Sequence, residues 1–222
     1  GHRGMRPGWH SHCRCFGQGN RLSESPDTTP LVSRAGGKLQ HALDVFDLDV
    51  TGLRCADLGC NVGGFTDCLL RGGAASVISL DTGYGILAWK LRQDPRVEVR
   101  ERSNAMHAEP PEDGVDLVTL DLGWTPQRHA LPAAKQWIKD GGRILSLVKP
   151  HYELNEAQRR EHLVDGRLSD EVAEAMLLAV LESLDGLGLH AINTTISPIR
   201  GGKSSRGKGK GNREYLLLAE VQ

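Results

Sequence analysis

Apolar residues along the chain alternate between short continuous runs and longer stretches with helical spacing. The continuous runs have the length of strands buried on both faces, and they occupy residues 53–59, 77–81, 97–101, 115–121 and 143–149. The stretches between them place apolar residues three or four apart, as helices do, at 33–46, 63–73, 85–93, 131–142 and 168–188. This alternation predicts a Rossmann-like, doubly wound α/β domain with a mostly parallel sheet.

Two more strands, 190–197 and 213–221, follow the last helix with no helix between them. They are therefore expected to pair antiparallel, which makes seven strands with an antiparallel last strand. Ser33 and Ser169 precede the first and last helices and are the expected N-terminal caps. One strand ends in a charged residue, since 145–148 reads LSLV and Lys149 follows it. A charge at the end of a core strand needs a partner or a position at a rim.

The chain divides into two unequal parts. Residues 1–30 are polar, basic and without apolar periodicity, and we expect a flexible tail there. The HSHCRC stretch at 10–15 in this tail has C-x-C spacing with no second pair downstream, so we expect no metal site. Residues 31–222 form one α/β domain by this reasoning.

Composition narrows the class of protein. With 39% hydrophobic and 25% charged residues, the 222-residue chain is typical of a globular protein. Its five cysteines, three of them in expected core elements, favour a reducing cytoplasm, and its apolar runs are too short to cross a bilayer. The formal net charge is −1, so any affinity for a polyanion depends on a local cluster of basic residues.

A glycine-rich loop follows the first strand and opens into a helix. It reads DLGCNVGGF, with D-x-G-x-x-x-G-G spacing instead of the G-x-G-x-x-G that holds a pyrophosphate. Asp57 favours a cationic or amine-bearing ligand over a phosphate. Asp81 ends the second strand, where a carboxylate can accept hydrogen bonds from ribose hydroxyls. S-adenosylmethionine has both features, a positively charged amine-bearing part for Asp57 and a ribose for Asp81. The alternatives are that the loop binds a dinucleotide or is only a structural turn.

Charged residues also follow strands on the other side of the expected switch in strand order. Ligands of doubly wound folds bind at the carboxyl ends of strands, near this switch. Asp121 follows the fourth strand and Lys149 follows its expected neighbour, so the two should face each other. An acid in such a place can also cap the next helix, and a lysine can simply be solvated.

Six stretches in order resemble the FtsJ-type ribose 2′-O-methyltransferases, and most of all their TlyA (haemolysin A-like) group, which methylates ribosomal RNA. These are SRAGGKL, DLGCNVGGFTDCLL, DTGYGILAWKLRQDPRV, LDLGW, LVKPHYE and GNREYLLL, within residues 31–222. The resemblance implies a class I S-adenosylmethionine-dependent fold. It also implies a catalytic Lys-Asp-Lys-Glu tetrad at Lys38, Asp121, Lys149 and Glu214.

The cofactor site and the reaction are implied in the same way. Predicted cofactor contacts are Asp57, Gly59, Asn61, Gly63, Gly64, Phe65, Asp81, Asn104 and Asp121. A ribose hydroxyl is a poor nucleophile at neutral pH and needs a positioned base or electrostatic help. Lys149 is expected to provide this, with Asp121 and Glu214 orienting the lysines and with no metal ion.

A basic stretch, IRGGKSSRGKGKGNR, leads directly into Glu214 and contains no acid. A charge run is often only a solvated loop, but here phosphate contacts next to the site would be useful. The predicted RNA contacts are Arg34, Lys203, Arg206, Lys208, Lys210 and Arg213.

Two departures from the family pattern concern the target RNA. The TlyA group usually carries a small N-terminal RNA-binding domain, and LGWTP follows Asp121 where a serine and an aromatic are more common. The alternatives are methyl transfer to a substrate other than RNA, and a non-catalytic RNA-binding or haemolysin-like protein. No amphipathic lytic segment supports the last one.

Overall fold

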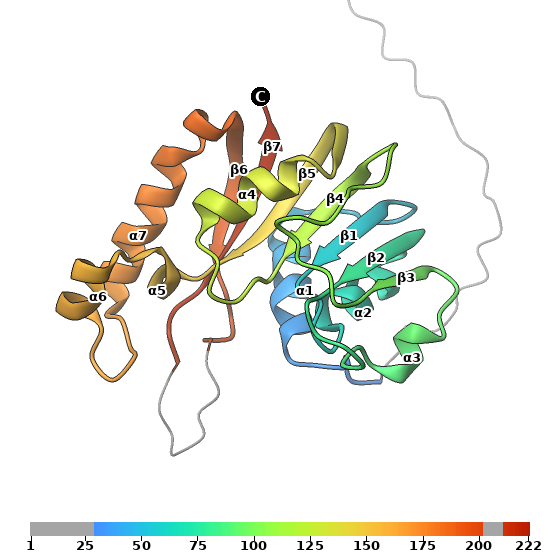
Figure 1. The fold of residues 1–222 in the computed structure, drawn as a ribbon, viewed down its shortest axis with the longest axis horizontal. Coiled ribbons are helices and arrows are strands. Elements are labelled where there is room, and N and C mark those ends of the chain that lie inside the picture. Colours follow the sequence, from blue (N-terminus) through green and yellow to red (C-terminus); the bar gives the residue numbers. More distant parts are fainter. Residues whose placement is uncertain (1–28, 202–210) are drawn as a thin grey trace, which may run out of the picture.

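The computed structural model describes residues 29–201 and 211–222, and these contain one central sheet with helices on both faces (Figure 1). Seven strands of the described chain form this sheet in the order β3-β2-β1-β4-β5-β7-β6. Their bounds are β1 Arg54–Leu58, β2 Ser76–Leu80, β3 Val97–Arg100, β4 Val115–Leu120, β5 Ile138–Val148, β6 Leu189–Ile196 and β7 Tyr215–Val221.

The strand order reverses direction between β1 and β4, which both pair parallel to their neighbours. The first five strands are parallel, whereas β7 lies antiparallel between β5 and β6. The predicted fold class and antiparallel last strand are therefore confirmed. The carboxyl ends of β1, β4 and β5 lie along one edge of the sheet, where β7 begins.

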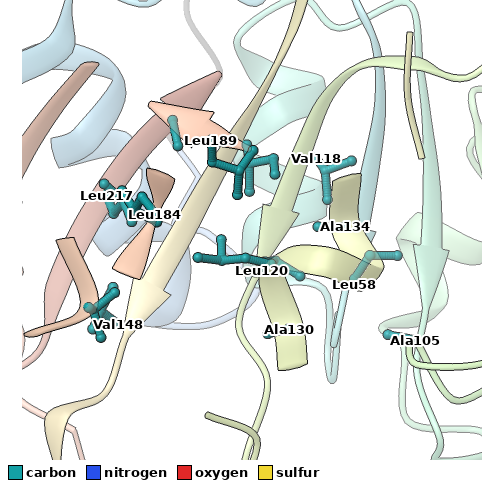
Figure 2. Close-up of a cluster of buried hydrophobic side chains, with 14 of the residues drawn as sticks. Leu58, Ala105, Val118, Leu120, Ala130, Ala134, Val148, Leu184, Leu189 and Leu217 are labelled. Atoms are coloured by element: carbon teal, nitrogen blue, oxygen red, sulfur yellow. The ribbon is translucent and has the colours of Figure 1, made fainter. Parts of the chain in front are cut away.

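Helices cover the two faces of the sheet and create two hydrophobic cores. On one face lie α1 Ala35–Phe46, α2 Gly64–Arg71 and the short α3 Trp89–Arg92, with Leu39, Leu69 and Leu91 buried against the strands. On the other face lie α4 Gln127–Lys135 and α7 Asp170–Ser183. Figure 2 shows part of this second core, where Val118 and Leu120 of the sheet lie near Ala130 and Ala134.

Three short helical elements complete the described chain: α5 Pro150–Glu153, α6 Glu156–His162 and the 3₁₀-helix η1 Asp185–Leu187. The apolar end of β5 is buried as its composition predicts, because Leu145 and Val148 are 0% exposed. None of the helices in the described part of the chain is long and apolar enough to cross a membrane.

The structure corrects three local predictions. Ser33 is not at the N-cap of the first helix: α1 begins at Ala35 with Arg34 at the N-cap, and Ser33 Oγ instead accepts a hydrogen bond from the backbone N–H of Ala35 at 3.3 Å. By contrast, Ser169 accepts a hydrogen bond from the backbone N–H of Val172, as predicted. The helix expected at 85–93 is a single turn at Trp89–Arg92, because Gly83 and Gly85 place a loop before it.

The third correction concerns residues 131–142, which were predicted to be entirely helical. The helix ends at Lys135, and β5 already begins at Ile138. Ile138 pairs with Val115 of β4, and an irregularity in register precedes the next pair, between Leu117 and Arg143. Backbone pairing thus overrides the local helical pattern of this short stretch.

Candidate active site

Three adjoining hollows open at the sheet edge where β1 and β4 end. Their volumes are about 290, 320 and 360 Å³. Gly59, Asn61 and Asp121 line all three, so the hollows form one connected site around the glycine loop. This is the position that the switch in strand order predicts for a ligand site.

The glycine loop must pass close to the chain that follows β4. Gly59 has φ +90°, and a Cβ atom on it would lie 2.8 Å from the carbonyl oxygen of Asp121. Any other residue would therefore be strained and would also push the two strand ends apart. Gly63 has φ +95° and packs against Leu87 and Leu91, so it shapes the turn into α2. It is not among the residues that line the three hollows.

Asp57, the last but one residue of β1, lies beneath this loop and is fully buried. One carboxylate oxygen accepts hydrogen bonds from the backbone N–H of Thr66 at 2.9 Å and from its hydroxyl at 2.7 Å, and the other accepts from Thr119 at 3.1 Å. Burial raises the pKa of Asp57 to about 7; the three hydrogen bonds oppose this rise and the charge of Asp121 adds to it. The carboxylate thus anchors α2 and borders the first hollow.

The buried position of Asp57 predicts a pH dependence of stability. Its pKa is raised, so between about pH 4 and pH 7 the folded protein keeps a proton that the unfolded chain releases. The free energy of unfolding from this group therefore falls as the pH rises through that window, by up to about 1.4 kcal/mol per pH unit. In urea unfolding, the free energy of unfolding of Asp57→Asn should increase relative to that of the wild type as the pH rises from 4 to 7.

Asp140→Asn is the matched control, because Asp140 is exposed on β5 and should give a difference that stays constant with pH. A constant difference for Asp57→Asn as well would mean that Asp57 ionises in its ordinary range, and would contradict this account.

The second strand supplies the acid predicted to hold a ribose. Asp81 lines the hollow of about 320 Å³ together with Asn104, as predicted. Its two carboxylate oxygens accept hydrogen bonds from the backbone N–H groups of Asn61 and Gly83, at 2.9 and 2.8 Å. Asp81 therefore fixes the glycine loop and keeps lone pairs for a ligand. The side chain of Asn104 accepts from the backbone N–H of Met106 and fixes the adjacent turn.

The first hollow contains the remaining residues predicted to contact a cofactor. Gly64 and Phe65 line it, although Phe65 is only 2% exposed. Gly64 approaches α1 so closely that a Cβ atom on Gly36 would lie 2.6 Å from its carbonyl oxygen. The contact roles of all these residues stay predictions, since their placement alone does not test them.

The four residues of the predicted tetrad meet in the hollow of about 360 Å³. Lys149 Nζ lies 2.6 Å from Asp121 Oδ1, and it donates a hydrogen bond to the carbonyl of Leu122 at 3.0 Å. Lys38 Nζ lies 2.5 Å from Glu214 Oε2. One ion pair thus joins Lys38 of α1 to Glu214 just before β7, 176 positions away. The neighbouring pair joins Asp121 and Lys149, which directly follow β4 and β5. Lys149 at the end of β5 has the charged partner that its position demands.

The two ion pairs differ in burial. Lys38 and Glu214 are 7% and 3% exposed, whereas the side chains of Lys149 and Asp121 keep 13% and 23%. Burial raises the pKa of Glu214, and the positive charges of Lys38 and Lys149 hold that rise back. Both lysines line the same hollow, and Lys149 is the more accessible of the two.

The sequence model of the family described as "FtsJ-like methyltransferase" matches residues 31–217 of this chain. A 16S/23S rRNA (cytidine-2′-O)-methyltransferase TlyA of Mycobacterium tuberculosis is 40% identical over 194 residues, which cover 86% of this chain and 69% of the relative.

The chain belongs to the FtsJ-like methyltransferase family. Hemolysin A of Brachyspira hyodysenteriae is 34% identical over 83% of this chain and 75% of its own length. The solved structure of a hemolysin-type protein from Streptococcus thermophilus, also 34% identical, matches with a TM-score of 0.78 over 89% of this chain and 69% of the other. The resemblance read from the six sequence stretches is confirmed.

Within this FtsJ-like site, the structure shows aromatic residues that sequence reasoning did not assign. Trp124 is 78% exposed, has φ +59°, and its ring centroid lies 5.0 Å from that of Tyr152. Tyr152 also contacts His151, with 4.1 Å between ring centroids, and both line the tetrad's hollow. The available signal was the position of these residues directly after Asp121 and Lys149, the two strand ends.

His151 is a second unassigned residue of the site. Its Nδ1 is buried without a hydrogen-bond partner in the described chain. Burial lowers the pKa of His151 to about 4, with the positive charges of Lys149 and Arg159 acting in the same direction. The ring is therefore neutral at pH 7 and adds no third positive charge beside the lysines.

The predicted RNA contacts fall into three groups. Arg34 lines two of the hollows, next to Lys38 in one of them. Arg213 lies one residue before Glu214, and its guanidinium pairs with Asp170. Lys203, Arg206, Lys208 and Lys210 lie outside the described residues, as do the HSHCRC stretch and nearly all of the predicted tail. All six contacts stay predictions.

Among residues 29–201 and 211–222, no group of three or more His, Cys, Asp or Glu side chains is arranged to hold a metal ion. The three cysteines of this part, Cys55, Cys60 and Cys68, are buried and free. Burial is the main cause that raises the pKa of all three thiols, so they act as core side chains.

Proposed function

We propose that this FtsJ-like methyltransferase uses S-adenosylmethionine to methylate a ribose 2′-hydroxyl of ribosomal RNA in the cytoplasm. The observation that carries the proposal is the Lys149–Asp121 ion pair at 2.6 Å, beside the buried Lys38–Glu214 pair and open to a hollow next to the glycine loop. The name of the relative from Mycobacterium tuberculosis supports the choice of ribosomal RNA and of the 2′-oxygen.

The residues around the glycine loop fit this cofactor. Asp81 offers carboxylate lone pairs for ribose hydroxyls, and Asn104, which lines the same hollow, would lie near the adenine. Gly59 leaves the space that a side chain would fill, and the buried carboxylate of Asp57 favours positive charge nearby. When bound, the cofactor supplies an electrophilic methyl group on a sulfonium.

Lys149 is the residue that acts on the ribose hydroxyl in this proposal. Its ammonium group is held between Asp121 and the Leu122 carbonyl, so its position is fixed before a substrate enters. From there the ammonium form can orient the hydroxyl and stabilise the oxygen as it gains negative charge, whereas the neutral amine form, once it has lost a proton to solvent, can accept the hydroxyl proton. Holding the oxygen in line with the methyl group lowers the barrier further through proximity.

Lys38 and Glu214 support this arrangement from behind. Their pair adds a positive charge that is fixed within a buried wall of the hollow and is balanced by its own carboxylate. A preorganised charge of this kind stabilises developing negative charge without reorganising when the reaction occurs.

Methyl transfer to total ribosomal RNA tests the proposal. Purified enzyme, labelled S-adenosylmethionine and ribosomal subunits that lack the modification should give labelled RNA. Alkaline hydrolysis should leave the label in an alkali-resistant dinucleotide, because a 2′-O-methyl group blocks cleavage at that position. Label released as a methylated base, or transfer only to protein or small molecules, would overturn the proposed reaction.

A variant of Asp81 tests the cofactor assignment. Asp81→Ala should weaken S-adenosylmethionine binding by about 1.5–3 kcal/mol, the magnitude of hydrogen bonds to a charged group. Asp81→Asn is the matched variant, since it retains one acceptor for the loop amides and should lose less. Calorimetric titration measures both affinities. An unchanged affinity in Asp81→Ala would show that the ribose does not lie against β2.

The exposed Trp124–Tyr152 pair predicts a contribution to RNA binding. A nucleobase stacked on an aromatic ring contributes about 1–3 kcal/mol. Tyr152 lines the tetrad's hollow, and the exposed ring of Trp124 lies against Tyr152. Trp124→Ala should therefore raise the KM for RNA about tenfold or more, with cofactor affinity unchanged, while Trp124→Phe should retain most of the binding. Equal KM values for wild type and Trp124→Ala would place the target base elsewhere.

A further inference from the structure

Two arginines hold the same carboxylate at the start of α7. Arg200 donates two hydrogen bonds to Asp170, from Nη1 to Oδ1 at 2.8 Å and from Nη2 to Oδ2 at 2.6 Å. Arg213 Nη2 donates to the same Oδ2 at 2.5 Å. Bidentate pairing of this kind fixes geometry as well as charge. The hydrogen bonds from both arginines lower the pKa of Asp170, so the carboxylate stays charged.

The positions of these arginines along the chain connect Asp170 to the active site. Arg200 directly precedes Gly201, and Arg213 directly precedes Glu214 of the tetrad. Gly201 lies so close to Glu214 that a Cβ atom on it would be 1.9 Å from Oε1. The backbone of Gly201 therefore forms the wall against which the catalytic carboxylate rests, and both residues line the tetrad's hollow.

A second set of contacts holds the same two chain segments at the turn before α7. Asn212 Oδ1 accepts from the backbone N–H of Leu168 at 2.8 Å, and Asn212 Nδ2 donates to the carbonyl of Gly166 at 3.0 Å. The backbone N–H of Gly201 donates to the carbonyl of Asn212 at 2.9 Å. Residues 200–201 and 212–213 are thus hydrogen-bonded to each other and to residues 166–170.

We propose that Asp170 is a positioning residue for methyl transfer: through Arg200 and Arg213 it fixes Gly201 and Glu214, and thereby the Lys38–Glu214 pair. It touches neither substrate nor cofactor. The hydroxyl-activating residue Lys149 lies in the same hollow as Glu214, so a shift of this carboxylate changes the charge that surrounds the reacting oxygen. This inference rests on the proposed methyl transfer and adds a role for α7, none of whose residues lines the three hollows.

The test compares Asp170→Asn with a control on the same helix. Asp170→Asn keeps the shape of the side chain and removes its charge, and Glu174→Gln makes the same change at an exposed position one turn further on. Single-turnover methyl transfer should fall about tenfold in Asp170→Asn and remain normal in Glu174→Gln. The KM for RNA and the affinity for S-adenosylmethionine should change less than twofold. A normal rate in Asp170→Asn, with only a lower melting temperature, would show that Asp170 and its two arginines contribute only to stability, and would overturn the proposal.

A double-mutant cycle with Arg200→Gln provides a second test. If Asp170 acts through Arg200, the double variant should lose no more rate than the worse single variant, whereas losses that multiply would contradict the proposal. Arg200→Lys, which keeps the charge but not the bidentate geometry, should give an intermediate rate and serves if Asp170→Asn does not fold.

A measurement that needs no activity separates this inference from the proposed function. The backbone N–H of Ser197 donates a hydrogen bond to the Glu214 carbonyl at 2.9 Å. In Asp170→Asn, the amide hydrogens of Ser197 and Gly201 should exchange faster with solvent than in the wild type. Amides of β1 should keep wild-type protection. Unchanged exchange at Gly201 and Ser197 would overturn the positioning role of Asp170. An inactive wild type would overturn only the proposed methyl-transfer reaction.

Discussion

Replacement of Lys149 by alanine is expected to reduce the rate of methyl transfer by about 10²–10⁴-fold, the usual contribution of a positioned proton acceptor. Lys149 Nζ faces the open hollow and is fixed by Asp121 and the Leu122 carbonyl. The loss should appear in the rate of a single turnover, with RNA and cofactor affinities near normal, because the interaction forms mainly in the transition state. Quench-flow measurement at saturating cofactor over a range of pH gives this rate.

Lys149→Arg distinguishes charge from proton transfer. The guanidinium keeps a positive charge next to Asp121 but cannot accept a proton near neutral pH, so rescue should be poor if Lys149 acts as a base. Asp121→Asn should retain correct folding and lose part of the rate, since Lys149 then lacks its charged partner. A folded Lys149→Ala enzyme with a near-normal rate would return this lysine to the role of a solvated strand end.

The second large effect is expected in stability and concerns the buried Lys38–Glu214 pair. Glu214→Leu leaves the ammonium group of Lys38 buried without its partner, which should lower the free energy of unfolding by about 3–5 kcal/mol. The double variant Lys38→Met/Glu214→Leu removes both charges and should recover most of that loss, because the uncompensated charge has gone. Urea unfolding at pH 7 measures all the variants.

The double variant should nevertheless remain inactive in methyl transfer. A protein that is stable and folded but without activity would separate the catalytic role of the pair from its structural one. Full stability in Glu214→Leu would instead show that Lys38 finds another partner or reaches water. Lys38→Met should cost less at acidic pH than at neutral pH, since the raised pKa of Glu214 allows this carboxylate to be protonated.

The sequence alone was enough to predict the residues at the strand ends. Asp57, Asp81, Asp121 and Lys149 each follow a recognisable apolar run, and the ends of parallel strands meet at one edge. The pairing of Lys149 with Asp121 followed from the expected adjacency of their strands, and the structure confirms it. The fold class was predictable for the same reason, because its pattern repeats along the whole chain.

Other parts of the site could not be derived from local pattern. Lys38 lies on an amphipathic helix and Glu214 precedes a strand, and only the family resemblance linked them, since 176 residues separate the two. Gly201 gave no signal in the sequence, because its importance comes from its closeness to the Glu214 carboxylate. The helix predicted at 131–142 failed where long-range pairing with β4 draws Ile138 into a strand.

The antiparallel position of β7 between β5 and β6 has a consequence for biosynthesis. Glu214 directly precedes β7, which follows the other six described strands in sequence, and it pairs with Lys38, which is synthesised 176 residues earlier. β7 must insert between two strands that are already synthesised, so a nascent chain that has not yet extended beyond Glu214 has Lys38 but no complete tetrad. The Lys38–Glu214 pair can therefore form only after residue 214 has been synthesised, and a chain that terminates before β7 leaves β5 unpaired on one side and β6 without its partner strand.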